Sequence, residues 1–130
     1  MPGMPAAKER DQVVALDTHL IQPPPPATPV MVPHPFTGQL DGDLSGDVKI
    51  EGMAAATVGS TATNTPSHIP IGGSFVNPPS NRGEVTTGSA TVLINGRQAA
   101  RMGDTAKTCN DPVDKPGGTV IAGSTVLIGG

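Results

Sequence analysis

The sequence has very few large aromatic side chains: tryptophan and tyrosine are absent, and phenylalanine occurs twice in 130 residues. It also has a single cysteine, which excludes an intrachain disulfide. Valine, leucine, isoleucine and phenylalanine make up about a fifth of the chain, so a core must be thin and filled by small and β-branched groups. Small domains with thin cores usually depend on a disulfide, a metal or a partner. Because the disulfide is excluded, we expect a metal or a partner.

Charge and long apolar runs are also scarce. Eight basic and eleven acidic residues give a net charge of −3, and the basic residues are scattered, which argues against a nucleic-acid partner. No segment approaches the roughly 20 apolar residues of a membrane span, and the N-terminus lacks an apolar run of signal-peptide length. We therefore expect one domain over residues 1–130, made in the cytoplasm without a signal peptide.

Glycine and proline, in contrast, are abundant, with 17 and 15 copies. A proline-rich stretch over residues 22–35 predicts a polyproline-like segment at the surface. Helical periodicity is weak throughout, and its best candidate, residues 11–21, could equally be an extended run with a turn at Asp17–Thr18. Short β-branched runs bounded by glycine predict strands elsewhere. These runs cover residues 48–50, 92–94, 120–121 and 126–128. We therefore expect a mainly β chain.

A repeat of the form Gly-x-x-Ala-Ala, followed four residues later by Asp or Ser, occurs three times. The copies, residues 3–11, 52–60 and 96–104, align without gaps, which disfavours chance similarity in a Gly/Ala-rich sequence. A β-branched run precedes the second and third copies, whereas the run that should precede the first lies at the C-terminus, over residues 126–128. The sequence therefore predicts a ring of three quasi-equivalent β-hairpin units, one of them completed by the two halves of the chain, with no exposed sheet edge.

Possible metal ligands follow the register of this repeat. His19 and His68 each lie eight residues after the last residue of a copy, and Cys109 lies five residues after the third copy. His34 comes from the proline-rich stretch, between two prolines. Loops of three quasi-symmetric units converge on one axis, so we expect these four side chains to form a tetrahedral site. Three histidines and a cysteine belong to the ligand set of zinc, and four protein ligands leave no open position, so the predicted ion is structural.

Each of these residues also has an ordinary interpretation. A lone histidine is more often a surface or hydrogen-bonded residue than a ligand, and a lone cysteine is more often a small buried apolar group. The shared register favours a metal. A small metal-dependent hydrolase or toxin using the same histidines is the alternative function, but it would need an open coordination position and a nearby base. Glu51 and Glu84 are candidates for that base without any pattern to support them.

The repeat motifs resemble those of the PAAR-repeat family, named for a Pro-Ala-Ala-Arg motif. Residues 5–8 are Pro-Ala-Ala-Lys, and residues 98–101 are Gln-Ala-Ala-Arg. Residues 54–57 keep only the alanine pair. The resemblance spans essentially the whole chain.

This resemblance implies a small cone with pseudo-three-fold symmetry and a zinc near its apex. The implied ligands are His19, His34, His68 and Cys109. The implied role is not enzymatic: the blunt base caps the trimeric β-helical spike of a contractile injection system, one tip per trimer, and the point punctures the target membrane. Such systems include type VI secretion systems and extracellular phage-tail-like particles. The candidate base strands are residues 48–50, 92–94 and 126–128. A separately encoded effector is a further candidate partner, because the chain ends within its last repeat and leaves no room for a fused one.

Overall fold

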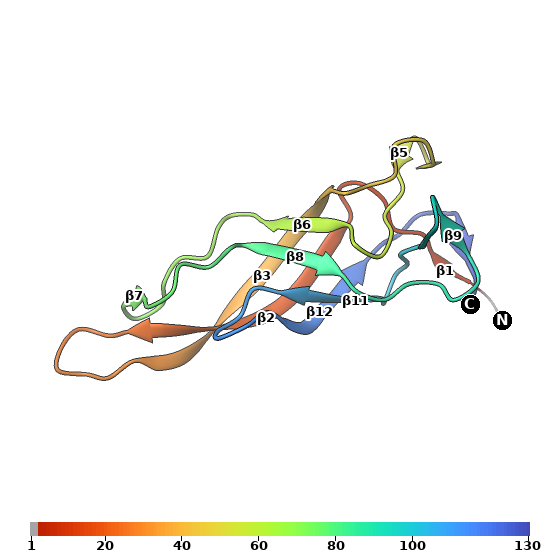
Figure 1. Cartoon of the computed structure of the whole chain (residues 1–130). Helices are drawn as coiled ribbons and strands as arrows, with labels where there is room; N and C mark the ends of the chain where they lie inside the picture. The colour runs from red at the N-terminus through yellow and green to blue at the C-terminus, as the bar shows by residue number, and fades with distance from the viewer. Residues whose placement is uncertain (1–2) are drawn as a thin grey trace.

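The strands of the chain form a closed barrel with three short hairpins at one end (Figure 1). The computed structural model describes residues 3–130, and all regular elements in that range are β-strands. A helix able to cross a membrane is therefore lacking among these residues. The mainly β fold predicted from the sequence is confirmed.

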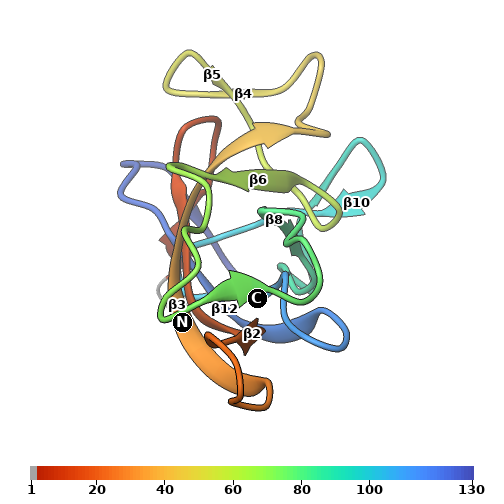
Figure 2. The ribbon, with the colours of Figure 1, turned by 90° about the vertical axis from the view of Figure 1, so that its left-hand side faces the viewer.

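Six antiparallel strands close the barrel, and each repeat contributes one hairpin to it (Figure 2). The strands are β2 (Gln12–Gln22), β3 (Val30–Gly42), β6 (Thr61–Asn64), β8 (Arg82–Val85), β11 (Thr105–Thr108) and β12 (Lys115–Ile121). They neighbour one another in this order, and β12 pairs back with β2. Closure leaves the barrel without a free edge over its paired length, as the ring of repeats predicts.

The hairpin of β2 and β3 extends beyond the barrel and forms the longest part of the narrow end (Figure 1). β2 is one continuous strand, so residues 11–21 are extended and the turn considered at Asp17–Thr18 is absent. The polyproline-like prediction is wrong for residues 30–35, which pair with β2 in regular register. Pro33 and Pro35 point outward, and β6 pairs with β3 only from Gly38 onward. β3 is therefore an edge strand at both prolines, where a missing N–H donor is tolerated.

Three two-stranded hairpins form the base of the molecule, one from each repeat. They pair β4 (Lys49–Ile50) with β5 (Met53–Ala54), β9 (Leu93–Ile94) with β10 (Arg97–Gln98), and β13 (Leu127–Ile128) with β1 (Met4–Pro5). In the third hairpin Met4 lies opposite Ile128, so strands from the two ends of the chain complete one unit. The split repeat predicted from the sequence is thus confirmed, and its three strand segments lie at the base.

The three alanine pairs lie where the repeats meet. The N–H of Ala7 donates to the carbonyl of Ala100, that of Ala100 to Ala56, and that of Ala56 to Ala7, with N···O distances of 2.9–3.0 Å. The three hydrogen bonds therefore run in a closed circle. All three residues are buried and belong to one apolar cluster, and their backbones approach closely, so only a small side chain fits.

The last residue of each repeat copy stabilises the turn that follows the alanines. The side chains of Asp11, Ser60 and Asp104 accept a hydrogen bond from the backbone N–H three residues earlier, at 2.9, 3.0 and 2.7 Å. Short polar side chains are common at such turns because they satisfy backbone donors locally. The recurring Asp or Ser of the sequence motif therefore has a structural role.

Two apolar clusters fill the interior, and the three alanines of the circle belong to the barrel cluster. The base cluster contains one alanine and one isoleucine from each repeat: Ala6, Ala55, Ala99, Ile50, Ile94 and Ile128. The barrel cluster is larger and includes Val13, Phe36, Leu40, Val85 and Val120. Further toward the narrow end the buried residues are mostly polar, and there the candidate site begins.

Enlarging a side chain of the alanine circle should destabilise the protein. Ala56→Val places two extra methyl groups against Ala7 and Ala100, so we expect a loss of about 1–3 kcal/mol in the free energy of unfolding, measured by chemical denaturation. The exposed Ala90→Val is the matched control and should change the stability by less than about 0.5 kcal/mol. Equal stability of the two variants would contradict the packing assigned to the circle.

Candidate metal centre

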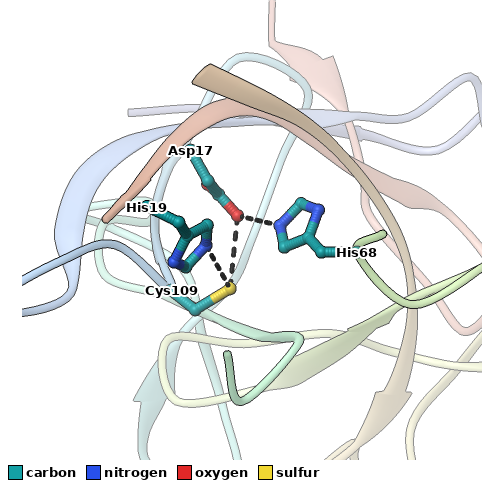
Figure 3. Close-up of side chains that lie close together, drawn as sticks. All are labelled: Asp17, His19, His68 and Cys109. Atoms are coloured by element: carbon teal, nitrogen blue, oxygen red, sulfur yellow. Dashed lines mark hydrogen bonds and ion pairs between the residues drawn. The ribbon is translucent and has the colours of Figure 1, made fainter. Parts of the chain in front are cut away.

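Four side chains with metal-binding atoms meet at the narrow end of the barrel (Figure 3). Asp17 and His19 belong to β2, His68 to the loop after β6, and Cys109 directly follows β11. Their ligand atoms all lie within 4.8 Å of one another. The group therefore draws one segment from each of the three repeats, and its side chains are almost completely buried.

The strand geometry of β2 explains why two of these side chains share one face. Residues two apart in a strand point to the same side, so Asp17 and His19 both face inward. Asp17 lies opposite His34 of β3, which brings a third inward-facing polar side chain to the same level. The two phenylalanines flank these rings: the Phe75 centroid lies 5.7 Å from that of His19, and the Phe36 centroid lies 6.1 Å from that of His68.

The Asp17 carboxylate is at the centre of the hydrogen-bonding network. Its Oδ2 accepts hydrogen bonds from His68 Nε2 at 2.7 Å and from Cys109 Sγ at 3.2 Å. Its Oδ1 accepts a hydrogen bond from the hydroxyl of Thr108. On the other side of the sulfur, His19 Nε2 lies 3.7 Å from Cys109 Sγ. A buried carboxylate is costly unless such donors surround it, and here three donors do so.

The electrostatic environment affects two of the candidate ligands in opposite directions. Burial lowers the pKa of His19, so its imidazole is neutral at pH 7 and retains a lone pair for a metal. Burial, followed by the charge and hydrogen bond of Asp17, raises the pKa of the Cys109 thiol to about 12. In the metal-free protein the sulfur is therefore protonated at neutral pH, and a metal ion must displace that proton to bind a thiolate.

His34 lies beside this group. Its ring centroid is 5.6 Å from those of His19 and His68. The Ile71 N–H donates to His34 Nε2 at 3.2 Å, so Nε2 accepts and Nδ1 donates to the Val32 carbonyl at 2.9 Å. The structure thus brings three of the four ligands predicted from the sequence together, and it places the fourth next to them with both ring nitrogens hydrogen-bonded.

Asp17 was not predicted as a site residue. A signal was available in the sequence, because Asp17 precedes the predicted ligand His19 by two residues. That spacing places both on one face only if the segment is a strand. The turn considered at Asp17–Thr18 concealed this relation.

The donor set fits a tetrahedral metal ion, and one of its separations has the length expected between two ligands of zinc. Imidazole nitrogen and thiolate sulfur are typical zinc ligands, and a carboxylate is an accepted third type. With ordinary zinc bond lengths, a tetrahedral ion separates a nitrogen from a sulfur ligand by about 3.6 Å. The 3.7 Å between His19 Nε2 and Cys109 Sγ agrees with that separation.

Neither glutamate considered as a catalytic base lies in this group. Glu51 is in the exposed turn between β4 and β5 at the base, where it accepts a hydrogen bond from Thr125. Glu84 is on β8 and its side chain is 44% exposed, 3.9 Å from the Lys107 ammonium.

The comparisons with known proteins agree with the repeat pattern. The family model described as PAAR motif matches residues 22–113 and, in a second alignment, residues 76–130. A comparison with curated proteins found no match. The first alignment alone covers well over half of the chain, and the three-fold circle of alanines contains the motif residues themselves. The chain therefore belongs to the PAAR-motif family, whose known role is that of a structural spike tip in contractile injection systems.

Proposed function

We propose that this protein caps the trimeric spike of a contractile injection system, one copy per trimer, and that its narrow end leads into the target membrane. The observation that carries this proposal is the pseudo-three-fold base, in which a single chain presents three related hairpins. A trimer presents three equivalent surfaces, and one chain with three quasi-equivalent units can meet all of them at once. We further propose that the protein is made in the cytoplasm and assembled into the particle, where a separately encoded effector is a further candidate partner.

The base also exposes apolar side chains suited to a docking surface. Leu93 of β9 and Leu127 of β13 occupy equivalent positions in their hairpins and are 60% and 58% exposed. Met4 of β1 and Val126 are partly exposed at the same end. The fully buried core of a protein interface is more apolar than the rest of the surface, and these side chains suit such a core. We therefore assign the spike contact to these hairpins.

The spike contact predicts that charge at the base prevents assembly. Leu93→Glu combined with Leu127→Glu should reduce the affinity for the purified trimeric spike at least about tenfold, because it buries two carboxylates without partners. The matched control is Leu16→Glu combined with Val113→Glu, since both side chains are 64% exposed and neither belongs to a base hairpin. Affinity can be measured by titration calorimetry and stoichiometry by native mass spectrometry. Undiminished binding by the base variant would contradict the assignment.

We infer that the metal group binds one structural zinc ion. His19, His68 and Cys109 would supply three ligands, one from each repeat, so that the ion links the three units where the apolar core is thin. The fourth ligand would be His34, as the sequence predicts, or Asp17, which already lies among the other three. Nearly complete burial of the ligand side chains favours a structural ion over a catalytic one, which needs an open position.

Zinc binding should be pH-dependent in a direction set by Cys109. Because the thiol pKa is raised to about 12, the metal-free site carries this proton throughout pH 7–9, and binding releases it. The apparent affinity should therefore rise about tenfold per pH unit in this range, measured by competition with a chelator. Cys109→Ser should lose most of the affinity and the pH dependence. A flat profile in the unmodified protein would contradict thiolate ligation.

The fourth ligand can be assigned with two further variants. The zinc content of purified His34→Gln and Asp17→Asn protein should differ. Loss of zinc only in the His34 variant assigns His34, and loss only in the Asp17 variant assigns Asp17. The melting temperature in the presence of EDTA serves as the control for folding in both.

Two segments at the narrow end of the molecule contain no charged residue, which supports a role at a membrane. Residues 18–40 and 61–81 make up a third of the chain and contain none of its eight basic and eleven acidic residues. Pairing of β7 (Ser74–Phe75) with the end of β2 holds the two segments side by side (Figure 1). Exposed aliphatic side chains occur on both segments: Val30, Met31, Ile69, Ile71 and Val76.

Hydrocarbon penalises charges and unpaired backbone donors, and this end is poor in both. A charged side chain costs about 2.5–3.5 kcal/mol at the centre of a bilayer. The turn between β2 and β3 is rich in proline, which has no N–H to desolvate. The composition of the narrow end therefore lowers the free energy of its passage through lipid.

Charge introduced at the narrow end should reduce lipid binding. We expect the double variant Met31→Lys, Ile69→Lys to bind neutral phosphatidylcholine vesicles at least about tenfold more weakly in a flotation assay. The control is Leu93→Lys combined with Leu127→Lys, which places the same two charges on similarly exposed leucines at the base and should leave vesicle binding unchanged. If the control weakens binding equally, the narrow end is not the lipid-facing one.

A further inference from the structure

The short segment after β11 is held along β2 by three hydrogen bonds to the backbone of that strand. The N–H of Asp111 donates to the Thr18 carbonyl at 2.8 Å, and Asp111 Oδ2 accepts a hydrogen bond from the Leu20 N–H at 2.7 Å. Asn110 Oδ1 accepts the Thr18 N–H, also at 2.7 Å. These contacts fix Asp111 beside His19, which lies between Thr18 and Leu20 on β2, and they leave the Asp111 residue only 8% exposed.

The two nitrogens of His19 face different groups. Nδ1 is buried without a hydrogen-bond partner and lies 3.6 Å from Asp111 Oδ2. Nε2 faces the metal group, 3.7 Å from Cys109 Sγ. A carboxylate oxygen can only accept a hydrogen bond, whereas a neutral imidazole has one N–H and one lone pair. A proton on Nδ1 would point toward an acceptor, whereas a lone pair on Nδ1 would be repelled by the negatively charged oxygen. The carboxylate therefore favours the tautomer with the proton on Nδ1.

From this arrangement we propose that Asp111 is a positioning residue that holds His19 in the Nδ1–H tautomer and thereby directs the Nε2 lone pair toward the metal group. The inference rests on the zinc site proposed above. A carboxylate that accepts the second N–H of a ligating histidine fixes both the tautomer and the orientation of the ring. Asp111 itself contributes no atom to the ligand group.

His68 provides a comparison within the same site. Its Nε2 is hydrogen-bonded to Asp17 Oδ2 at 2.7 Å, so a carboxylate within the ligand group holds it. His19 has no such contact, and Asp111 approaches it from the side opposite the ligand group. The second ring nitrogen of His68, Nδ1, lies 3.2 Å from the side-chain amide nitrogen of Asn64. Of the two ligands, His19 is therefore the one with a carboxylate beside its second ring nitrogen.

Asp111→Asn is the variant that isolates this role. The amide oxygen can still accept the Leu20 N–H, so the segment remains fastened to β2, but the negative charge beside His19 is removed. Changes of such outer carboxylates typically weaken metal binding 10- to 100-fold. Asp114→Asn is the matched control, because Asp114 is exposed in the same loop and makes no contact with His19.

The experiment combines the tautomer of the metal-free protein with zinc affinity. Long-range ¹H–¹⁵N spectra of ¹⁵N-histidine-labelled protein in EDTA should show His19 protonated at Nδ1. The preference should be weaker in Asp111→Asn, because the amide oxygen facing Nδ1 still accepts a hydrogen bond but carries no charge. Zinc affinity, measured by chelator competition, should fall 10- to 100-fold in Asp111→Asn, while Asp114→Asn keeps the original affinity and both keep the original melting temperature in EDTA.

Two results would overturn the inference: a His19 proton on Nε2 in the unmodified protein, or an affinity of Asp111→Asn within twofold of the original. If the unmodified protein binds no zinc, the proposed metal is refuted instead. The tautomer spectrum is recorded without metal and does not depend on that outcome. If Asp111→Asn fails to fold, the spectrum of the unmodified protein decides the question alone.

Discussion

The circle of backbone hydrogen bonds between Ala7, Ala56 and Ala100 determines the geometry of the rest of the molecule. Each repeat donates to one neighbour and accepts from the other, so the three segments leave the axis in equivalent directions. β2, β6 and β11 each begin five residues after their alanine, and the base hairpins precede it. Because the circle requires close approach of three backbones, the residues within it must be small.

The two ends of the molecule are stabilised in different ways. At the base, alanines and isoleucines of the three repeats form an apolar cluster. At the narrow end, the buried groups are His19, His34, Asp17 and Thr108, with Phe75 beside the histidines. Buried polar groups stabilise a structure only when they are satisfied, so this half depends on its hydrogen bonds and on the proposed ion. The scarcity of large apolar residues in the sequence is thus reflected in the narrow end, whose interior is mostly polar.

The sequence predicts those features that repeat and misses those that arise from pairing across the chain. The gapless copies predicted the ring and the split unit. Their register also predicted that His19, His68 and Cys109 converge, and in the structure these three lie in one group. Local proline content predicted the wrong conformation for residues 30–35, because pairing with β2 and the open edge of β3 outweigh it. Asp17 and Asp111 have no counterpart in the repeat. Their positions depend on the β2 strand and on contacts between residues about 90 positions apart.

The third base hairpin, which joins β1 to β13, has a consequence for the order of folding. Met4 cannot find its partner until residue 128 is present, and the barrel seam between β12 and β2 likewise joins distant parts of the chain. Such non-local pairing slows folding, because the entropy of closing a long loop is lost before the new contacts compensate for it. During synthesis the first two units therefore remain an open ring. The free edge of β2 is closed only when β12 leaves the ribosome, and the base is completed when β13 follows.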